Sequence, residues 1–324
     1  MTDFGFSTAL SLMRRTAPFI MFRLVVYAGI ALAYVLATGV GAGVGYGIGA
    51  FWGPEGRMAG SGYGALAGFG LTAAALYLLR EYTLYLVKAG HIAVMVELLH
   101  GRAIPNGQGQ IAYARGMVAD RFGTANVLFG IDQLVKGVIG AVTGLLQGLL
   151  SVLPIPGAAQ VMGMVRGYLK VAVGLLDEVM LAHCFATGVE NPFLGARTAL
   201  VLYAQNARPM LVNAAWVTAC VWGLSVMVFL LMLVPAGVVA WMLPGQVTAA
   251  GFGFALVFAW AVKAALIEPF ALACMLQAYF NVTSGQTPDP VWTERLDQAS
   301  DKFTDLGQRA TAWIRPHAPQ GVSA

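Results

Sequence analysis

The 324-residue sequence has little charge: Asp, Glu, Lys and Arg together make up 10% of it, against about 25% in soluble globular domains. With 58% hydrophobic residues, this composition excludes a soluble enzyme. It also excludes a disordered chain, which combines low hydrophobicity with high charge. A polytopic membrane protein remains. In a membrane protein, the formal net charge of +4 reflects basic residues that collect on the cytoplasmic side of the membrane. No nucleic-acid partner is predicted.

Cysteine and histidine are also scarce. Cys184, Cys220 and Cys274 fall inside apolar stretches and lack zinc or redox spacing, so they are interpreted as buried small hydrophobic residues. The four histidines are too dispersed for a metal site, and ordinary hydrogen bonding is favoured over a proton-relay role for His183. No Ser-His-Asp spacing, HExxH motif or P-loop occurs. We therefore predict no catalytic residue, no metal, no cofactor and no enzyme activity.

Long apolar runs are abundant instead. About 20 apolar residues carry a helix across a hydrocarbon core about 30 Å thick. Six runs reach that length, at 18–40 (continuing to 52), 61–79, 125–153, 158–187, 210–243 and 247–280. Residues 80–99 continue the helical pattern of the second run, which predicts one long helix that leaves the membrane. The predicted fold class is all-α, a polytopic transmembrane helical bundle of about six spans with cytoplasmic amphipathic helices.

An alternative topology has four spans. The runs 125–153 and 158–187 carry a stripe of polar and small residues, so they either line a wet cavity or lie in the membrane interface.

Basic residues lie almost entirely on one side of this map. The loops on the other side contain a single basic residue, Arg57. By the positive-inside rule both termini are cytoplasmic, in a multi-pass protein of the inner (plasma) membrane. The basic residues on the cytoplasmic side are Arg14, Arg15, Arg80, Lys88, Arg102, Arg115, Arg121, Arg197, Arg208, Arg295, Lys302, Arg309 and Arg315.

The map divides the chain into three parts. Residues 1–100 form an N-terminal glycine-rich transmembrane hairpin with its projecting helix. Residues 101–288 form a four-span transmembrane core with amphipathic cytoplasmic connections at 111–121 and 197–208, which we expect on the inner leaflet. Residues 289–324 form a cytoplasmic amphipathic tail that lies on a surface or binds a partner.

Glycine is the second abundant feature. Every second residue from 39 to 49 is glycine, which generates two interleaved GxxxG tracks on a helix, and a further track begins the second span. Missing side chains at i and i+4 let two helices approach to backbone contact. A tight hairpin of the first two spans is favoured over a dimer seam and over a flexible gate. The predicted packing residues are Gly39, Gly43, Gly47, Gly60, Gly64 and Gly68.

Eight ionisable residues lie deep in the spans, where each costs about 2.5–3.5 kcal/mol on insertion scales. Four are acidic and four basic, so they either pair across helices or line a polar path. Trp260 lies one turn from one of the lysines, and an aromatic ring beside a carboxylate suits a quaternary ammonium. The predicted substrate path consists of Asp132, Lys136, Arg166, Lys170, Asp177, Glu178, Lys263, Glu268 and Trp260.

Three strings between about residues 110 and 310 resemble the choline transporter-like membrane proteins: ARGMVADRFGTANVLFGIDQL, ENPFLGARTALVLYAQNARPMLVNAA and ACMLQAYFNVTSGQTPDPVWTERLDQAS. In that family a cytoplasmic Arg and a Gly-Thr or Gly-Ser precede an apolar span, and an Ala-Arg-x-Ala helix is followed by an Asn and a basic residue. The matching positions are Arg121, Gly123, Thr124, Ala196, Arg197, Ala199, Asn206 and Arg208. The resemblance implies a transporter-like core.

These features predict an integral membrane transporter for a small polar or cationic solute, such as one that resembles choline. Four acids of the path would attract the cation: Asp132, Asp177, Glu178 and Glu268. The lysines of the path would hold these acids in place or release them. The alternatives are a non-transporting accessory or scaffold subunit of a membrane protein complex, and a lipid-handling membrane protein. The expected partners are membrane lipids, a small cationic solute, and further copies of the chain or a larger membrane complex.

Overall fold

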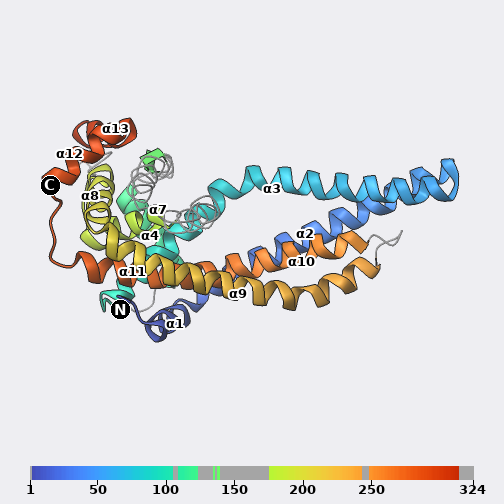
Figure 1. The fold of residues 1–324 in the computed structure, drawn as a ribbon, viewed down its shortest axis with the longest axis horizontal. Coiled ribbons are helices and arrows are strands. Elements are labelled where there is room, and N and C mark those ends of the chain that lie inside the picture. The colour runs from blue at the N-terminus through green and yellow to red at the C-terminus, as the bar shows by residue number, and fades with distance from the viewer. Residues whose placement is uncertain are drawn as a thin grey trace, which may run out of the picture. The chain divides into compact units, whose positions relative to one another are not determined.

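The computed structural model describes residues 2–104, 109–122, 134–135, 137–138, 175–242 and 248–313. Every regular element in these residues is a helix, as the sequence predicts. The helices gather into two compact units that are each discontinuous in sequence (Figure 1). Unit 1 comprises Met1–Thr16, Leu86–Thr218 and Ala271–Ala324, and unit 2 comprises Ala17–Tyr85 and Ala219–Phe270.

Three stretches of the described residues are long and apolar enough to cross a membrane: Ala17–Leu76, Ala207–Met242 and Gly251–Thr283. They cover four of the six predicted runs, because the first stretch folds back on itself and contains two of them. It contains α2 (Ala17–Gly49), the short 3-10 helix η1 (Ala50–Trp52) and the beginning of α3 (Gly53–Leu99). Most of the predicted spans 125–153 and 158–187 lies outside the described residues.

The α2–α3 hairpin of unit 2 is held by glycines. Its turn ends at Gly53, whose backbone φ of 79° is rarely adopted by residues that have a Cβ. Beyond the turn the two backbones touch at three levels, where a Cβ on the α2 glycine would lie 1.9–2.1 Å from the facing carbonyl oxygen. The facing pairs are Gly41 with Gly64, Gly45 with Gly60, and Gly49 with Gly56. At these three levels no side chain fits between the two backbones.

The contact uses one of the two glycine tracks of α2, and it is not the track that contains Gly43 and Gly47. A Cβ at either of those positions meets no atom within 4 Å, whereas a Cβ at Gly60, Gly64 or Gly68 of α3 would lie 2.0–2.2 Å from a backbone oxygen of α2. Two residues correspond to about 200° of rotation around a helix. The track at 39, 43 and 47 therefore points away from the track at 41, 45 and 49, and the sequence alone does not distinguish them.

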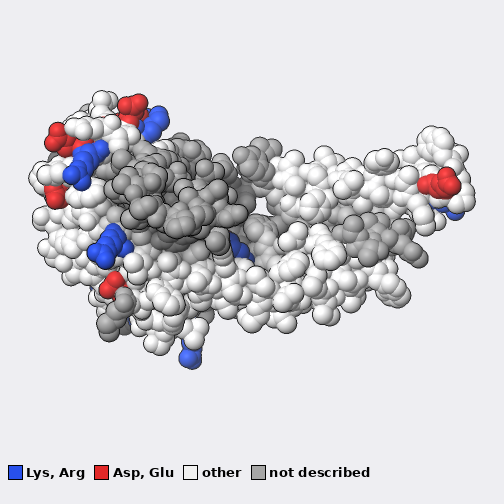
Figure 2. All heavy atoms as spheres, viewed as in Figure 1, with Lys and Arg blue, Asp and Glu red and all other residues white. Residues whose placement is uncertain are grey.

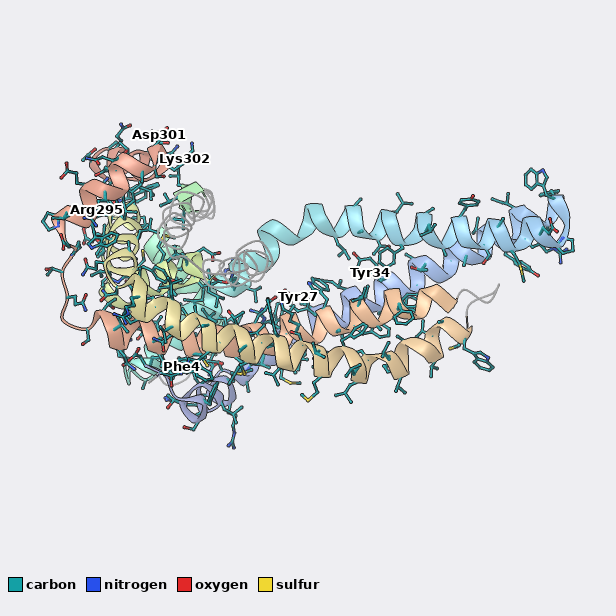
Figure 3. The ribbon with its side chains drawn as sticks, in the orientation of Figure 1. Phe4, Tyr27, Tyr34, Arg295, Asp301 and Lys302 are labelled. Atoms are coloured by element: carbon teal, nitrogen blue, oxygen red, sulfur yellow. The ribbon has the colours of Figure 1, made fainter. Side chains whose placement is uncertain are left out.

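The rest of unit 2 packs through aromatic and small residues from α2, α9 (Ala207–Met242) and α10 (Thr248–Val262). Tyr27 and Tyr34 lie along α2 (Figure 3). The first meets Trp260 edge to face with ring centroids 5.3 Å apart, and the second meets Phe69 at 4.8 Å. Many large apolar side chains of α2, α3 and α9 face outward, which suits contact with lipid.

The outer part of the α2–α3 hairpin carries its charged residues at the turn. In Figure 2 the part of the hairpin near its turn shows charge at the turn and white, uncharged residues next to it. The turn carries Glu55 and Arg57, which are exposed, next to the exposed rings of Phe51 and Trp52. An apolar lateral surface that ends in charged and aromatic residues is typical of a helix pair that crosses a bilayer.

Unit 1 is built from shorter helices with distinct start and stop signals. α7 (Leu176–Thr187) ends at Gly188, whose φ is 67°. α8 (Pro192–Gln205) begins with the side-chain cap of Asn191 and a proline in its first turn. The other helices with residues in unit 1 are α1 (Phe6–Arg15), α4 (Gln110–Phe122), α11 (Glu268–Thr283), α12 (Pro290–Ala299) and α13 (Asp301–Thr311), together with the ends of α3 and α9.

Two predictions for this unit are wrong. The segment predicted as a membrane-surface helix at 197–208 lies largely in α8, which packs against both α7 and α13 and is buried along much of its length. The tail is not one amphipathic helix on a surface but two helices separated at Ser300, and they bury Leu296, Phe303 and Leu306 completely. The apolar face of these helices is covered by the chain itself.

Candidate functional site

A buried acidic cluster lies in unit 1, where the first turn of α7 meets α3. Asp177 and Glu178 are 7% and 5% exposed, respectively. Lys88 of α3 forms an ion pair with each, at 3.5 Å to Asp177 and closer to Glu178. The positive end of the α7 dipole favours carboxylates at this position. Among the residues that the structure describes, the cluster nevertheless contains two acids and one base.

Burial changes the chemistry of this cluster. It raises the pKa of Glu178 well above its ordinary value, and the neighbouring Asp177 raises it further, while Lys88 opposes both effects. Two adjacent carboxyl groups that share one ammonium favour either a bound proton or a second positive charge. The arrangement is therefore suited to taking up a cation.

A hydrogen bond lies at the other end of α7. The hydroxyl of Tyr279 on α11 lies 3.0 Å from Nδ1 of His183, and both side chains are buried. Burial lowers the pKa of His183 to about 4. The imidazole is therefore neutral at physiological pH, in agreement with a hydrogen-bonding role.

A basic cluster lies in unit 2. Lys263 and Glu268 belong to consecutive helical turns, with their Nζ and Oε1 atoms 3.2 Å apart. The other oxygen of Glu268 lies 3.5 Å from the guanidinium of Arg23 on α2. This cluster has the opposite composition, two bases and one acid. Arg23 is 8% exposed at its side chain, whereas Lys263 and Glu268 are 37% and 40% exposed.

Pro269 explains why the Arg23 side chain binds to the backbone of the α10–α11 helix. Residues Lys263–Ile267 form a π-helical segment, η2, between α10 and α11. The nitrogen of Pro269 has no hydrogen, so it cannot donate to the carbonyl of Ala264 as the next π-helical bond requires. Arg23 donates to that oxygen instead, from Nε at 3.1 Å and from Nη2 at 2.6 Å. A buried carbonyl that the proline leaves without a backbone donor is thereby satisfied.

The predicted path residues thus fall into separate groups. Asp177 and Glu178 lie in the acidic cluster, and Lys263 and Glu268 lie in the basic cluster, with Trp260 against Tyr27 nearby on the same helices. Asp132, Lys136, Arg166 and Lys170 lie outside the described residues. The predicted path does not include Arg23, although this residue lies inside the first apolar run. Lys88 enters the prediction only as a basic residue of the cytoplasmic side.

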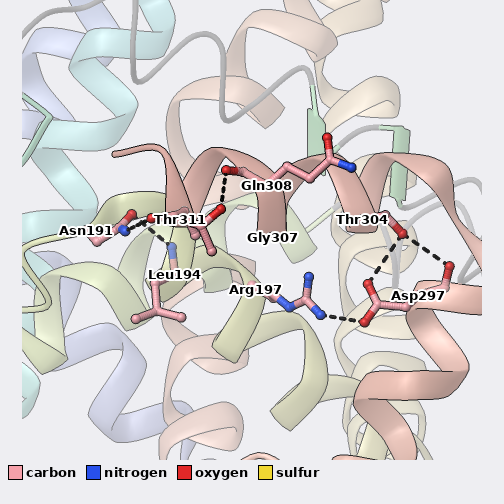
Figure 4. A pocket seen from close by; sticks show the side chains of 9 residues that line it. Asn191, Leu194, Arg197, Asp297, Thr304, Gly307, Gln308 and Thr311 are labelled. Carbon is pink, nitrogen blue, oxygen red and sulfur yellow. Dashed lines mark hydrogen bonds and ion pairs between the residues drawn. The ribbon is translucent and has the colours of Figure 1, made fainter. Parts of the chain in front are cut away.

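Arg197, one of the residues that carry the family resemblance, belongs to a third polar group (Figure 4). Arg197 of α8 forms an ion pair with Asp297, donates to the Phe303 carbonyl at 3.4 Å and lies 4.4 Å from the centre of the Phe303 ring. A Cβ at Gly307 would lie 2.0 Å from the guanidinium. Arg197 therefore fixes the tail helices on α8, beside a pocket of about 600 Å³.

The other residues of the resemblance are structural or undescribed. Ala196 and Ala199 are buried in α8, and the amide of Asn206 at its end donates to the Leu202 carbonyl at 2.9 Å. Arg208 begins α9, and the backbone of Arg121 belongs to α4. Gly123 and Thr124 lie outside the described residues.

Three carboxamides hold the N-terminal residues of unit 1. Asn213 exchanges hydrogen bonds with Asp3, at 2.8 Å from the backbone N–H and 2.6 Å to the carboxylate. Gln277 accepts from the N–H of Gly5, and Asn281 donates to the Asp3 carbonyl. A pocket of about 690 Å³ lies beside them. These contacts join the N-terminus to the start of α9 and to α11.

The described residues contain no group of three or more His, Cys, Asp or Glu side chains arranged to bind a metal ion. The chain matches no protein-family model, no curated protein and no solved structure.

Proposed function

We propose that the protein is a multi-pass inner-membrane transporter for a small organic cation, and that Asp177 and Glu178 belong to its binding site. The observation that carries the proposal is the buried cluster of two carboxylates and one ammonium. Buried carboxylates cost free energy unless a positive charge lies beside them, so a solute cation that takes the place of Lys88 would bind favourably. The resemblance to choline transporter-like proteins supports the same substrate class.

Lys88 is the residue that would exchange with the solute. Its side chain is 29% exposed while those of its two partners are 10% or less, so the ammonium can move away and the carboxylates cannot. A solute cation that takes its place keeps the cluster neutralised. Release of the solute then returns Lys88 to Asp177 and Glu178.

The candidate spans support a membrane location. The hairpin of α2 and α3, then α9, then α10 with α11 would cross the membrane four times, with both termini on the cytoplasmic side. Arg14 and Arg15 precede the first crossing, and the loop after it contains Arg57 as its one basic residue. Tags at the two ends, tested for accessibility in inverted and right-side-out vesicles, measure this topology, and an external C-terminus would exclude it.

The transport proposal is tested by uptake of labelled choline into proteoliposomes that contain the purified chain. Asp177→Asn and Glu178→Gln should each lower the initial rate at least about tenfold, the factor that corresponds to about 1.4 kcal/mol of lost cation binding. Glu294→Gln, on the exposed face of α12, is the matched control and should retain the wild-type rate. Uptake that is unchanged in both cluster variants rules out the residue assignment, and absence of uptake for choline and other small amines rules out the function.

A second candidate function is a scaffold subunit of a membrane complex, and the outward glycine track favours it. Gly43 and Gly47 are exposed on α2 with open space above them, as in a helix face that receives another helix. Copurification from native membranes separates the two functions. A stoichiometric complex that is lost in Gly43→Leu supports the scaffold, whereas a free protein with choline uptake supports the transporter.

A further inference from the structure

The basic cluster of unit 2 has an excess of positive charge on the outer surface of a candidate membrane span. One carboxylate, Glu268, is shared by Lys263 and Arg23. Arg23 is committed to the Ala264 carbonyl and is nearly enclosed, whereas more than a third of the Lys263 side chain is exposed. The ammonium of Lys263 is thus the part of the cluster that a ligand from outside can reach.

Helix length places this cluster at the level of the lipid headgroups. At about 1.5 Å per residue, roughly 39 Å separate Arg23 from Gly49 at the other end of α2. The hydrocarbon core is about 30 Å thick, and the bilayer with its interfacial layers about 40–45 Å. With the charged turn at Glu55 and Arg57 in one interface, Arg23 reaches the opposite interface and lies beyond the hydrocarbon.

The aromatic residues mark the same level independently. Tyr27 lies one turn from Arg23 on α2, Trp260 lies one turn from Lys263, and the two rings are in edge-to-face contact. Tyr and Trp are enriched where the headgroups begin. At the other end of unit 2, Trp52 and Trp241 are 72% and 87% exposed. Exposed aromatic residues thus lie at the far end of unit 2, and the basic cluster lies at the end that holds Tyr27 and Trp260.

We propose that Lys263, supported by Arg23, binds the phosphate of an anionic phospholipid in the leaflet at the N-terminal end of α2. An exposed ammonium next to hydrocarbon requires a counter-charge, and headgroup phosphates are the anions present at that depth. Glu268 competes with the lipid for the same ammonium and so limits its affinity. The proposal rests on the membrane crossing of α2 and is independent of transport, so a negative uptake assay leaves it unaffected.

The test measures thermal unfolding of the full chain in a neutral detergent as lipid is added. Phosphatidylglycerol should raise the apparent Tm of the wild-type protein by several degrees, and phosphatidylcholine or inorganic phosphate at the same concentration should not. Lys263→Gln should remove at least half of that increase, and Lys263→Arg should keep it. Arg57→Gln, which removes a basic residue at the opposite end of the hairpin, is the matched control and should respond like the wild type.

Glu268→Gln should change the response in the opposite direction, with a larger increase at lower lipid concentration. Native mass spectrometry supplies a second readout that does not depend on stability, because fewer phosphatidylglycerol molecules should stay bound to Lys263→Gln than to Arg57→Gln. Equal lipid retention by these two variants, or equal Tm increases with phosphatidylcholine, overturns the proposal. An equal effect of inorganic phosphate assigns the site to a free anion and overturns the lipid assignment.

Discussion

The acidic cluster of unit 1 and the basic cluster of unit 2 each contain three charged residues, yet they are built in opposite ways. In the acidic cluster two enclosed carboxylates share one partly exposed lysine. In the basic cluster an enclosed arginine and an exposed lysine share one carboxylate. The identity of the enclosed member matters, because the enclosed charge cannot return to water. This difference is the reason why we propose a cation site at the first cluster and an anion site at the second.

The largest expected effect comes from removing Lys88. Lys88→Met leaves two buried carboxylates without their base, and removal of one partner of a buried pair costs about 3–5 kcal/mol. The Tm measured in detergent should fall accordingly, and Glu178→Gln in the same chain should restore part of the loss. The matched control is Lys302→Met, which breaks an exposed pair with Asp305 and should change the Tm little. Equal losses in the two lysine variants would show that the acidic cluster is not buried in solution.

The glycine contact of unit 2 should give the next largest effect. Gly45→Ala places a methyl group 1.9 Å from the Gly60 carbonyl oxygen, and overpacking of this kind costs about 1–3 kcal/mol. Gly47→Ala, two residues away on the same helix, meets open space and is the control. Thermal unfolding of the two variants compares the tracks directly, and a more harmful Gly47→Ala would reverse the assignment of the packing face.

Arg23 should matter only as long as Pro269 is present. Arg23→Met leaves the Ala264 carbonyl unsatisfied, and a lost hydrogen bond from a charged group costs about 2 kcal/mol. Pro269→Ala restores an N–H donor, so the same arginine substitution should cost less in that background. A double-mutant cycle on unfolding free energies measures the coupling. Strictly additive losses would show that Arg23 acts through Glu268 alone.

The smallest effect is a difference in pH sensitivity, because all four histidines of the sequence belong to unit 1. His183 has a pKa of about 4 in the folded protein and an ordinary value near 6.5 when unfolded. Protons therefore favour the unfolded state once the pH falls below about 6.5, and the loss stops near pH 4. Between pH 7 and 5.5 it should amount to about 1 kcal/mol. His183→Gln should remove this part of the pH dependence, and an unchanged Tm profile would contradict the burial of the imidazole.

Much of the fold follows from the sequence because membrane helices are specified locally. The apolar runs at 18–40, 61–79, 210–243 and 247–280 correspond to helices of the structure, and the pattern of 80–99 correctly predicts that α3 continues as one helix. Caps at Asn191, Asp289 and Ser300 are also local signals. What fails is the assignment of faces, as at the two glycine tracks and at the amphipathic helices around Arg197.

The sequence by itself determined the helical class, the apolar stretches that can cross a membrane, and the identity of several residues whose charge needs a partner. The tertiary structure alone decided the pairings: Lys88 with Asp177 and Glu178, Arg23 with Glu268, and Gly45 with Gly60. Helix formation depends on neighbours three or four residues away, which any sequence displays. The two charge pairings each join residues more than 80 positions apart in the sequence. Such contacts depend on how the helices pack, which the helical periodicity of the sequence does not specify.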